Sequence, residues 1–208
     1  MAELVLPCFT ATAFEPNGAG VVVAHEGLGM TTHVMRFAER LAAEGYAVVA
    51  PDFFFRTGGP KDDDFWASIR AVTPEQLYED LASAIGSLRA QGSTSIGVTG
   101  FCMGGTFAYC AAKWAEALGV DAAVTFYGGE IAQQLGDLRC PTLLLFAGCD
   151  EYVPADDVAA VQAYHGDAVI VYPNSQHSFM RDGTANYDRH AAADAWSRLL
   201  VFFGEHLR

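Results

Sequence analysis

The chain alternates between continuous apolar runs and segments in which apolar residues recur at helical spacing. The apolar runs at 20–25, 46–50, 95–99, 122–126, 141–146 and 168–172 are typical of strands that a parallel sheet buries on both faces. Helices are predicted over 31–44, 73–89, 103–118, 154–164 and 187–207. Strands that alternate with helices in this way predict an α/β fold, with a mostly parallel sheet and helices on both of its faces.

Local signals support several of these boundaries. Gly45 follows the first helix, as a C-terminal capping glycine does. Thr73, Pro74 and Gln76 match a capping box with proline in the first turn. The segment 53–73 is the least regular part of the chain and is rich in aromatic residues, and a loop of this length is usually functional or a lid.

The predicted strands bring several loops to one edge of the sheet. Ligands of such sheets bind beyond the carboxyl ends of the strands. The loops after His25, Thr99, Phe146 and Tyr172 are therefore expected to share one rim. Because no stretch has the composition of a linker, residues 1–208 are interpreted as one domain.

The charge of the chain constrains its partners. A net charge of −13 and a pI near 4.6 argue against nucleic acid or an anionic membrane as partner, since both select basic surfaces. An anionic substrate would need a local cation to hold it against this field. The acidic run 62–64 is interpreted as a solvated loop rather than a metal site.

Cysteine usage and the apolar segments indicate a cytoplasmic protein. The chain has five cysteines, an odd number, and no Cys-x-x-Cys motif. Neither a disulfide framework nor a zinc site is therefore predicted. No signal peptide and no membrane-spanning stretch are recognised. We expect a small-molecule substrate, no cofactor, no metal and no membrane partner, in a monomer or small homo-oligomer.

One cysteine lies where chemistry is expected. Residues 100–105, Gly-Phe-Cys-Met-Gly-Gly, follow a predicted strand directly and open a helix, which is the pattern of a nucleophile elbow with Cys102 as nucleophile. The turn is so tight that a Cβ at Gly100 or Gly104 would collide with backbone. The helix N-terminus favours a thiolate, and the Met103 amide would point at a developing oxyanion. The alternative is a buried cysteine in a glycine-rich turn.

Two further residues complete the predicted triad. Asp150 and His177 each follow a later strand, in the chain order nucleophile, acid, histidine that α/β-hydrolases require. His177 would take the thiol proton, and Asp150 would orient the imidazole. The rivals for the acid are Glu151, Asp156 and Asp157.

The acid directly after the first core strand leaves two interpretations open. Glu26 on the active rim is either a buried functional carboxylate with a raised pKa or a carboxylate satisfied by turn amides. His25, at the strand end itself, is expected to support the site. A metal site at His25, Glu26 and His33 is a third, weaker interpretation. Their spacing does not match the His-Glu-x-x-His motif.

Taken together, these motifs resemble the dienelactone hydrolase (carboxymethylenebutenolidase) family of cysteine-dependent α/β-hydrolases. The matching pieces are 25–29 (His-Glu-Gly-Leu-Gly), 50–52 (Ala-Pro-Asp), 65–66 (Phe-Trp), 100–105, 126–128 (Phe-Tyr-Gly), 148–154 (Gly-Cys-Asp-Glu-Tyr-Val-Pro) and 177–181 (His-Ser-Phe-Met-Arg). They extend from the first core strand to the last loop.

The resemblance implies roles for residues that the pattern alone leaves unassigned. Cys102, Asp150 and His177 match the family's triad. Glu26 matches a glutamate that takes the thiol proton when substrate arrives. The amides of Gly27 and Met103 match the oxyanion hole.

The resemblance also implies a set of substrate contacts. Arg181 and Ser178 match positions that hold a substrate carboxylate, and Trp66 and Tyr127 match aromatic residues of the pocket. A second carboxylate-binding arginine of the family is missing, because residues 58–64 read Gly-Gly-Pro-Lys-Asp-Asp-Asp. Lys61 or Arg56 would have to replace it, and a lysine does not reproduce a bidentate clamp.

The sequence therefore predicts hydrolysis of a small ester or lactone, dienelactone-like and carrying a carboxylate, through a thioacyl-enzyme. Two alternatives stay open. One is a general carboxylesterase on the same scaffold. The other is a protein without catalytic activity that binds a ligand or senses oxidants through Cys102.

Overall fold

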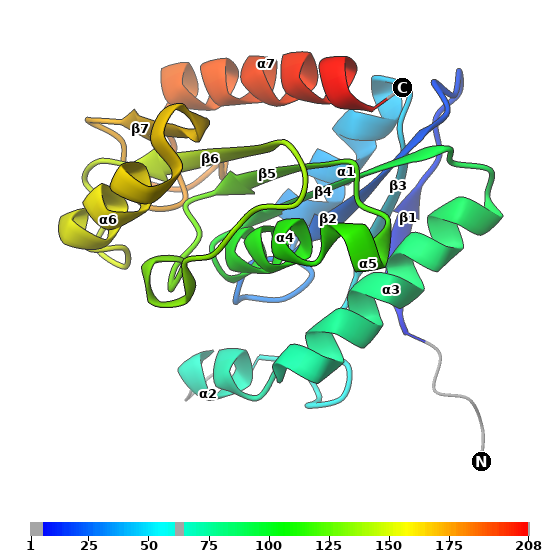
Figure 1. Cartoon of the computed structure of the whole chain (residues 1–208), viewed down its shortest axis with the longest axis horizontal. Helices are drawn as coiled ribbons and strands as arrows, with labels where there is room; N and C mark the ends of the chain where they lie inside the picture. Colours follow the sequence, from blue (N-terminus) through cyan, green and yellow to red (C-terminus); the bar gives the residue numbers. More distant parts are fainter. Residues whose placement is uncertain (1–5, 61–64, 208) are drawn as a thin grey trace.

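A single mixed sheet organises the chain, in a computed structural model that describes residues 6–60 and 65–207 (Figure 1). Its strand order is β1-β3-β2-β4-β5-β6-β7, with β1 antiparallel to β3 and the other pairs parallel. The strands are β1 (Cys8–Ala11), β2 (Ala19–Ala24), β3 (Ala47–Pro51), β4 (Ser95–Phe101), β5 (Ala122–Phe126), β6 (Thr142–Ala147) and β7 (Val169–Tyr172).

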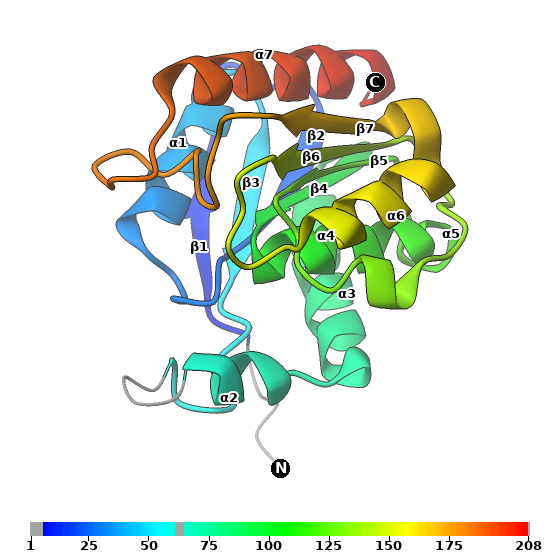
Figure 2. The same ribbon diagram turned by 90° about the vertical axis from the view of Figure 1, so that its left-hand side faces the viewer.

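Helices cover both faces of this sheet (Figure 2). One face packs on α1 (Thr32–Ala43) and α7 (Arg189–His206). The other face packs on α3 (Pro74–Ala90), α4 (Met103–Lys113), α5 (Ala115–Leu118) and α6 (Ala155–His165). The short helix α2 (Phe65–Arg70) precedes α3, and the 3₁₀ turns η1 (Ala132–Gln134) and η2 (Gly166–Ala168) lie in later loops.

The apolar runs are strands because the sheet buries them from both sides. In β2, Val21 and Val23 join the core under α1 and α7, whereas Val22 and Ala24 join the core under α3 and α4. Every residue of β2, β4, β5 and β6 is buried. A strand in this position has no polar face, which explains why its sequence is continuous rather than alternating.

Most of the predicted elements and the fold class are confirmed. The capping box of α3 forms as expected, since Gln76 N donates to Thr73 Oγ1 over 3.3 Å and Thr73 N donates to Gln76 Oε1 over 3.2 Å. The single helix predicted over 103–118 is wrong in one respect, because it breaks at Trp114 into α4 and α5. The sequence analysis missed β1, a half-exposed edge strand, and α2, which lies inside the irregular segment 53–73.

Some expectations fall on residues outside the described part of the chain. These are Lys61 as a substitute cation, the acidic run 62–64, and the absence of a signal peptide at the N-terminus. Of the described helices, none has both the length and the apolar character to span a membrane.

Of the described glycines, Gly104 has the closest backbone neighbour, and a substitution there tests how much the fold depends on this packing. A Cβ there would lie 2.2 Å from the carbonyl oxygen of Ala24, a contact that the sheet has no room to relieve. Gly104→Ala is expected to lower the free energy of unfolding by more than about 3 kcal/mol, measured by urea denaturation. Gly86→Ala is the matched control on α3, where a Cβ meets nothing within 4 Å, and it should stabilise by up to about 1 kcal/mol. Equal stability of the two variants would contradict the packing argument.

Candidate active site

The turn between β4 and α4 presents Cys102 at the carboxyl edge of the sheet. Cys102 has φ 53° and ψ −117°, a strained conformation for a residue with a side chain. Its amide donates to the carbonyl of Phe126 over 3.0 Å, which ties the turn to β5. A Cβ at Gly100 would lie 2.3 Å from the Gly104 carbonyl oxygen, so both glycines are needed for the turn to close. The thiol is half-buried.

Asp150 and His177 form the buried pair that the sequence analysis expected. His177 Nδ1 lies 2.7 Å from Asp150 Oδ2 and 2.9 Å from Oδ1. Oδ1 also accepts the amides of Tyr152 and Val153, which fixes the carboxylate in place. The rival acids do not make this contact: Glu151 is exposed, and Asp156 and Asp157 lie in the first turn of α6.

The environment of His177 makes its imidazole a stronger base than a free imidazole. Burial opposes the positive charge, but the hydrogen bond with Asp150 and the proximity of Cys102 outweigh it and raise the pKa of His177 from 6.5 to about 9. Nε2 of His177 is buried and has no hydrogen-bond partner in the described part of the chain. The ring therefore has one nitrogen held by Asp150 and the other available beside the thiol.

Glu26 is a buried carboxylate with two polar contacts. It follows β2, is 3% exposed, and receives a hydrogen bond from Thr31 Oγ1 at 3.1 Å and an ion pair from Arg181 Nη1 at 3.4 Å, both on Oε1. Burial raises its pKa, and Arg181 and Thr31 offset only part of this rise. No hydrogen bond joins it to Cys102 among the described residues, although both line one cavity.

His25 supports the loop that carries Glu26. It is fully buried, and its Nε2 accepts the amide of Phe53 over 3.0 Å. Nδ1 therefore carries the proton and donates to the carbonyl of Glu26 over 2.8 Å. Within residues 6–60 and 65–207, no group of three or more His, Cys, Asp or Glu side chains is arranged to hold a metal ion, so His25, Glu26 and His33 form no such cluster.

Two backbone amides next to Cys102 and Glu26 in the chain have no hydrogen-bond acceptor among the described residues. Met103 begins α4, and Gly27 follows Glu26. Unpaired donors at a helix start and in a neighbouring turn are suited to bind a developing negative charge.

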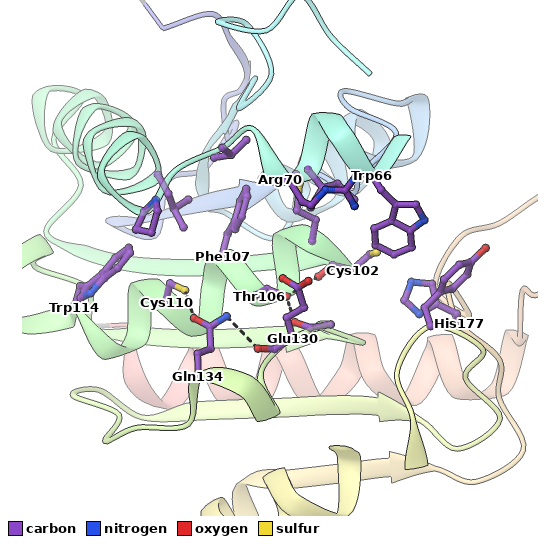
Figure 3. A pocket seen from close by; sticks show the side chains of 17 residues that line it. Trp66, Arg70, Cys102, Thr106, Phe107, Cys110, Trp114, Glu130, Gln134 and His177 are labelled. Carbon is purple, nitrogen blue, oxygen red and sulfur yellow. Dashed lines mark hydrogen bonds between the residues drawn. The ribbon is translucent and has the colours of Figure 1, made fainter. Parts of the chain in front are cut away.

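Two cavities meet at Cys102. One has a volume of about 500 Å³ and extends toward α3 and α4, and the other has about 410 Å³ and contains Glu26, Ser178 and Arg181. Both are lined by Trp66, Cys102, Tyr152 and His177. Figure 3 shows the larger cavity, with Cys102, His177 and Trp66 at one end.

The structure adds two residues that the sequence analysis did not single out. Tyr152 stacks edge-on against His177, with ring centroids 4.9 Å apart, and lines both cavities. Asn186 Nδ2 donates to the His177 carbonyl over 3.0 Å and so holds the histidine loop. Tyr152 lies two residues after Asp150, so its position near the triad could have been inferred. Asn186 carried no such signal.

Two expected positions differ in the structure. Tyr127 does not line either cavity: it is fully buried beneath His177, with ring centroids 4.9 Å apart. Arg56 does not serve the site either, because its Nη1 binds both oxygens of buried Asp80 at 2.6 Å. A cation that compensates a buried carboxylate is not available to a ligand.

The sheet order, the nucleophile turn and the buried acid–histidine pair define the class of α/β-hydrolases. A Klebsiella pneumoniae structure shares this fold with a TM-score of 0.82 over 98% of this chain and 100% of that chain, at 24% identity. A dienelactone hydrolase-like promiscuous phosphotriesterase from metagenomic libraries aligns with a TM-score of 0.77 and 25% identity, over 93% of this chain and 88% of that chain.

Sequence comparison narrows the class to one family. The model of the dienelactone hydrolase family matches residues 8–207. A Yersinia pestis protein named "Putative carboxymethylenebutenolidase" is 31% identical over 226 residues, which cover 97% of this chain and 84% of that protein. The chain therefore belongs to the dienelactone hydrolase family and is a carboxylic ester hydrolase of this type.

The burial of Glu26 predicts a pH-dependent cost in stability. Because its pKa is raised from 4.5, the folded state binds this proton more tightly than the unfolded chain, so stability falls as pH rises from about 4.5 through the folded pKa. Glu26→Gln keeps the shape and removes the titration. Relative to wild type, it is expected to gain stability at pH 8 and to lose this gain at pH 4, measured by chemical denaturation.

The control for this measurement is Glu151→Gln, an exposed residue that lines the same cavity. It should change stability little at either pH. A Glu26→Gln variant that is no more stable than wild type at pH 8 would contradict a net cost of burying this carboxylate.

Proposed function

We propose that this protein hydrolyses a small ester or lactone through a thioacyl-enzyme formed on Cys102. The supporting observation is the buried Asp150–His177 pair, whose unpartnered Nε2 lies beside Cys102 where the two cavities meet. His177 serves as the base, and Asp150 orients it and stabilises its charged form.

The reaction proceeds in two halves. In the first, Nε2 of His177 takes the thiol proton as Sγ attacks the ester carbonyl, and the tetrahedral oxyanion is held by the amides of Gly27 and Met103. The intermediate expels the alcohol, which receives the proton from His177. In the second, water gives a proton to His177 and attacks the thioester, and release of the acid restores the thiol of Cys102.

Glu26 supplies an alternative acceptor for the one thiol proton, which it takes in place of His177 when Nε2 of His177 already holds a proton and substrate is bound. Its raised pKa brings it closer to neutrality than that of an exposed carboxyl, which suits acid–base work. The contacts to Thr31 and Arg181 hold it at the wall of the cavity that Cys102 also lines. The Glu26→Gln variant should therefore acylate more slowly, and a wild-type acylation rate would limit Glu26 to a structural role.

Loss of the thiol tests the proposal directly. Cys102→Ala should leave a folded protein and reduce kcat for p-nitrophenyl acetate by at least about 10⁴-fold, because the covalent route is gone. Rapid-quench mass spectrometry of the wild type should show one acetyl group on the peptide that contains Cys102. Cys8→Ala, which changes an exposed thiol, is the matched control and should be fully active. Substantial turnover by Cys102→Ala would remove Cys102 as nucleophile.

Arg181 is the candidate anchor for a substrate carboxylate, together with Ser178. Both line the smaller cavity, and Arg181 is the one arginine or lysine among its described lining residues. Its charge is shared with Glu26, at 3.4 Å, and Glu151 lines the same cavity. This partial neutralisation favours the second candidate function, a general carboxylesterase that accepts neutral esters.

A single variant separates the two substrate classes. Arg181→Ala removes a charge-assisted contact and leaves Glu26 without its cation, so KM for dienelactone should rise at least about tenfold. KM for p-nitrophenyl acetate should change little. Arg36→Ala, which removes an exposed arginine paired with Asp182, is the control and should alter neither value. Equal effects of Arg181→Ala on both substrates would assign the protein to the general esterases.

A further inference from the structure

The larger cavity continues well past the reacting groups. Its floor is one side of α4, where Met103, Phe107, Cys110 and Trp114 follow one another at intervals of three or four residues. In Figure 3, Trp114 and His177 lie at opposite ends of the cavity, with Phe107 and Cys110 between them. From Met103 to Trp114 the helix rises by roughly 16 Å, at about 1.5 Å per residue. The cavity is therefore long as well as large.

The opposite wall is apolar. It is formed by Ile69 and Val72, at and after the end of α2, and by Pro74 and Leu77 at the start of α3. The helix α2 and the loop after it therefore cover the cavity along the length of α4. Of the aromatic residues in the irregular segment, Trp66 lines this cavity together with Cys102, whereas Phe53 and Phe54 are buried in the core.

Polar side chains inside the cavity are paired with the protein. Thr106 donates to the Gly129 carbonyl, Cys110 Sγ donates to Gln134 Oε1 over 3.1 Å, and Gln134 Nε2 donates to the Glu130 carbonyl over 3.2 Å (Figure 3). A ligand gains little by competing for groups that are already hydrogen-bonded. The charged residues of the lining, Arg70 and Glu130, are exposed and of opposite sign. The interior thus selects an apolar group.

We propose that the physiological substrate is an ester with an apolar chain of several carbons, which lies along α4 between Met103 and Trp114. This inference rests on the proposed thioacyl route and names its substrate class. The smaller cavity holds the other, shorter part of the ester near Ser178 and Arg181. Trp114 lines the end of the cavity opposite to Cys102, and Cys110 lies between them, so these two side chains set the length of chain that is accepted.

The experiment measures kcat/KM of the wild-type protein against substrate chain length in two series of esters. The p-nitrophenyl alkanoates from acetate to decanoate vary the acyl chain, and the alkyl acetates from methyl to decyl vary the alcohol. In one of the series, kcat/KM should rise about fourfold per methylene until the cavity is filled, because each buried methylene adds its transfer free energy. A flat or falling profile in both series would overturn the inference.

Substitutions of residues that line the cavity distinguish binding of the chain inside it from nonspecific hydrophobic binding elsewhere on the protein. Cys110→Met adds bulk in the cavity and should reduce the ratio of kcat/KM for octanoate, or octyl acetate, to that for the shortest ester at least fivefold. Trp114→Ala should shift the optimum to longer chains. Cys140→Met makes the same change at a half-buried cysteine of the same core that does not line the cavity, and the profile should not change.

The outcomes also distinguish this inference from the proposed function. Short esters turned over through Cys102, with the same profile in wild type and Cys110→Met, would overturn the long apolar site and leave the thioacyl route intact. No turnover of any ester by folded wild-type protein would overturn both. Circular dichroism and thermal melting of each variant establish that it is folded.

Discussion

The close approach of the start of α4 to the carboxyl end of β2 is the constraint on which the site depends. Gly104 lies against the Ala24 carbonyl, where a Cβ would come within 2.2 Å, and Gly105 lies against the Phe126 carbonyl in the same way, at 2.6 Å. The turn that this packing closes holds Cys102 at a strained positive φ. The same packing brings the start of α4 beside the turn that carries Glu26 and Gly27. If α4 packed less closely against β2, the thiol of Cys102 would lie further from the amide of Gly27 and from Glu26.

The electrostatics of the site follow from burial more than from net charge. The chain carries −13, yet the groups that matter are held by local contacts: Asp150 by two amides and His177, and Glu26 by Thr31 and Arg181. Burial raises the pKa of Glu26, and pairing raises the pKa of His177 to about 9. Both shifts favour transfer of the thiol proton to a neighbouring group. Arg181, the one arginine among the described residues that line the smaller cavity, is already engaged with Glu26, so this cavity offers little free positive charge to an anionic ligand.

The two cavities divide substrate recognition between different parts of the fold. Apart from Trp66 and Cys102, which line both cavities, the smaller cavity is built from the loops that follow β2, β6 and β7, which also carry Glu26, Asp150 and His177. The larger cavity is built from α4 and from the segment around α2, which contributes no member of the triad. Changes in the segment around α2 can therefore alter the accepted substrate without moving the reacting groups.

The sequence by itself determined the strands and most of the helices and singled out the proposed triad, because each leaves a local signal. Strands buried on both faces need uninterrupted apolar runs, the elbow needs glycines at 100 and 104, and the parallel topology places strand ends at one rim. Only the tertiary structure decided which partners the charged and aromatic side chains take. Arg56 binds Asp80, Tyr127 lies beneath His177, and the long cavity along α4 forms because α2 and α3 pack above it. These contacts join residues far apart in the chain, and their side-chain directions depend on packing that no local pattern encodes.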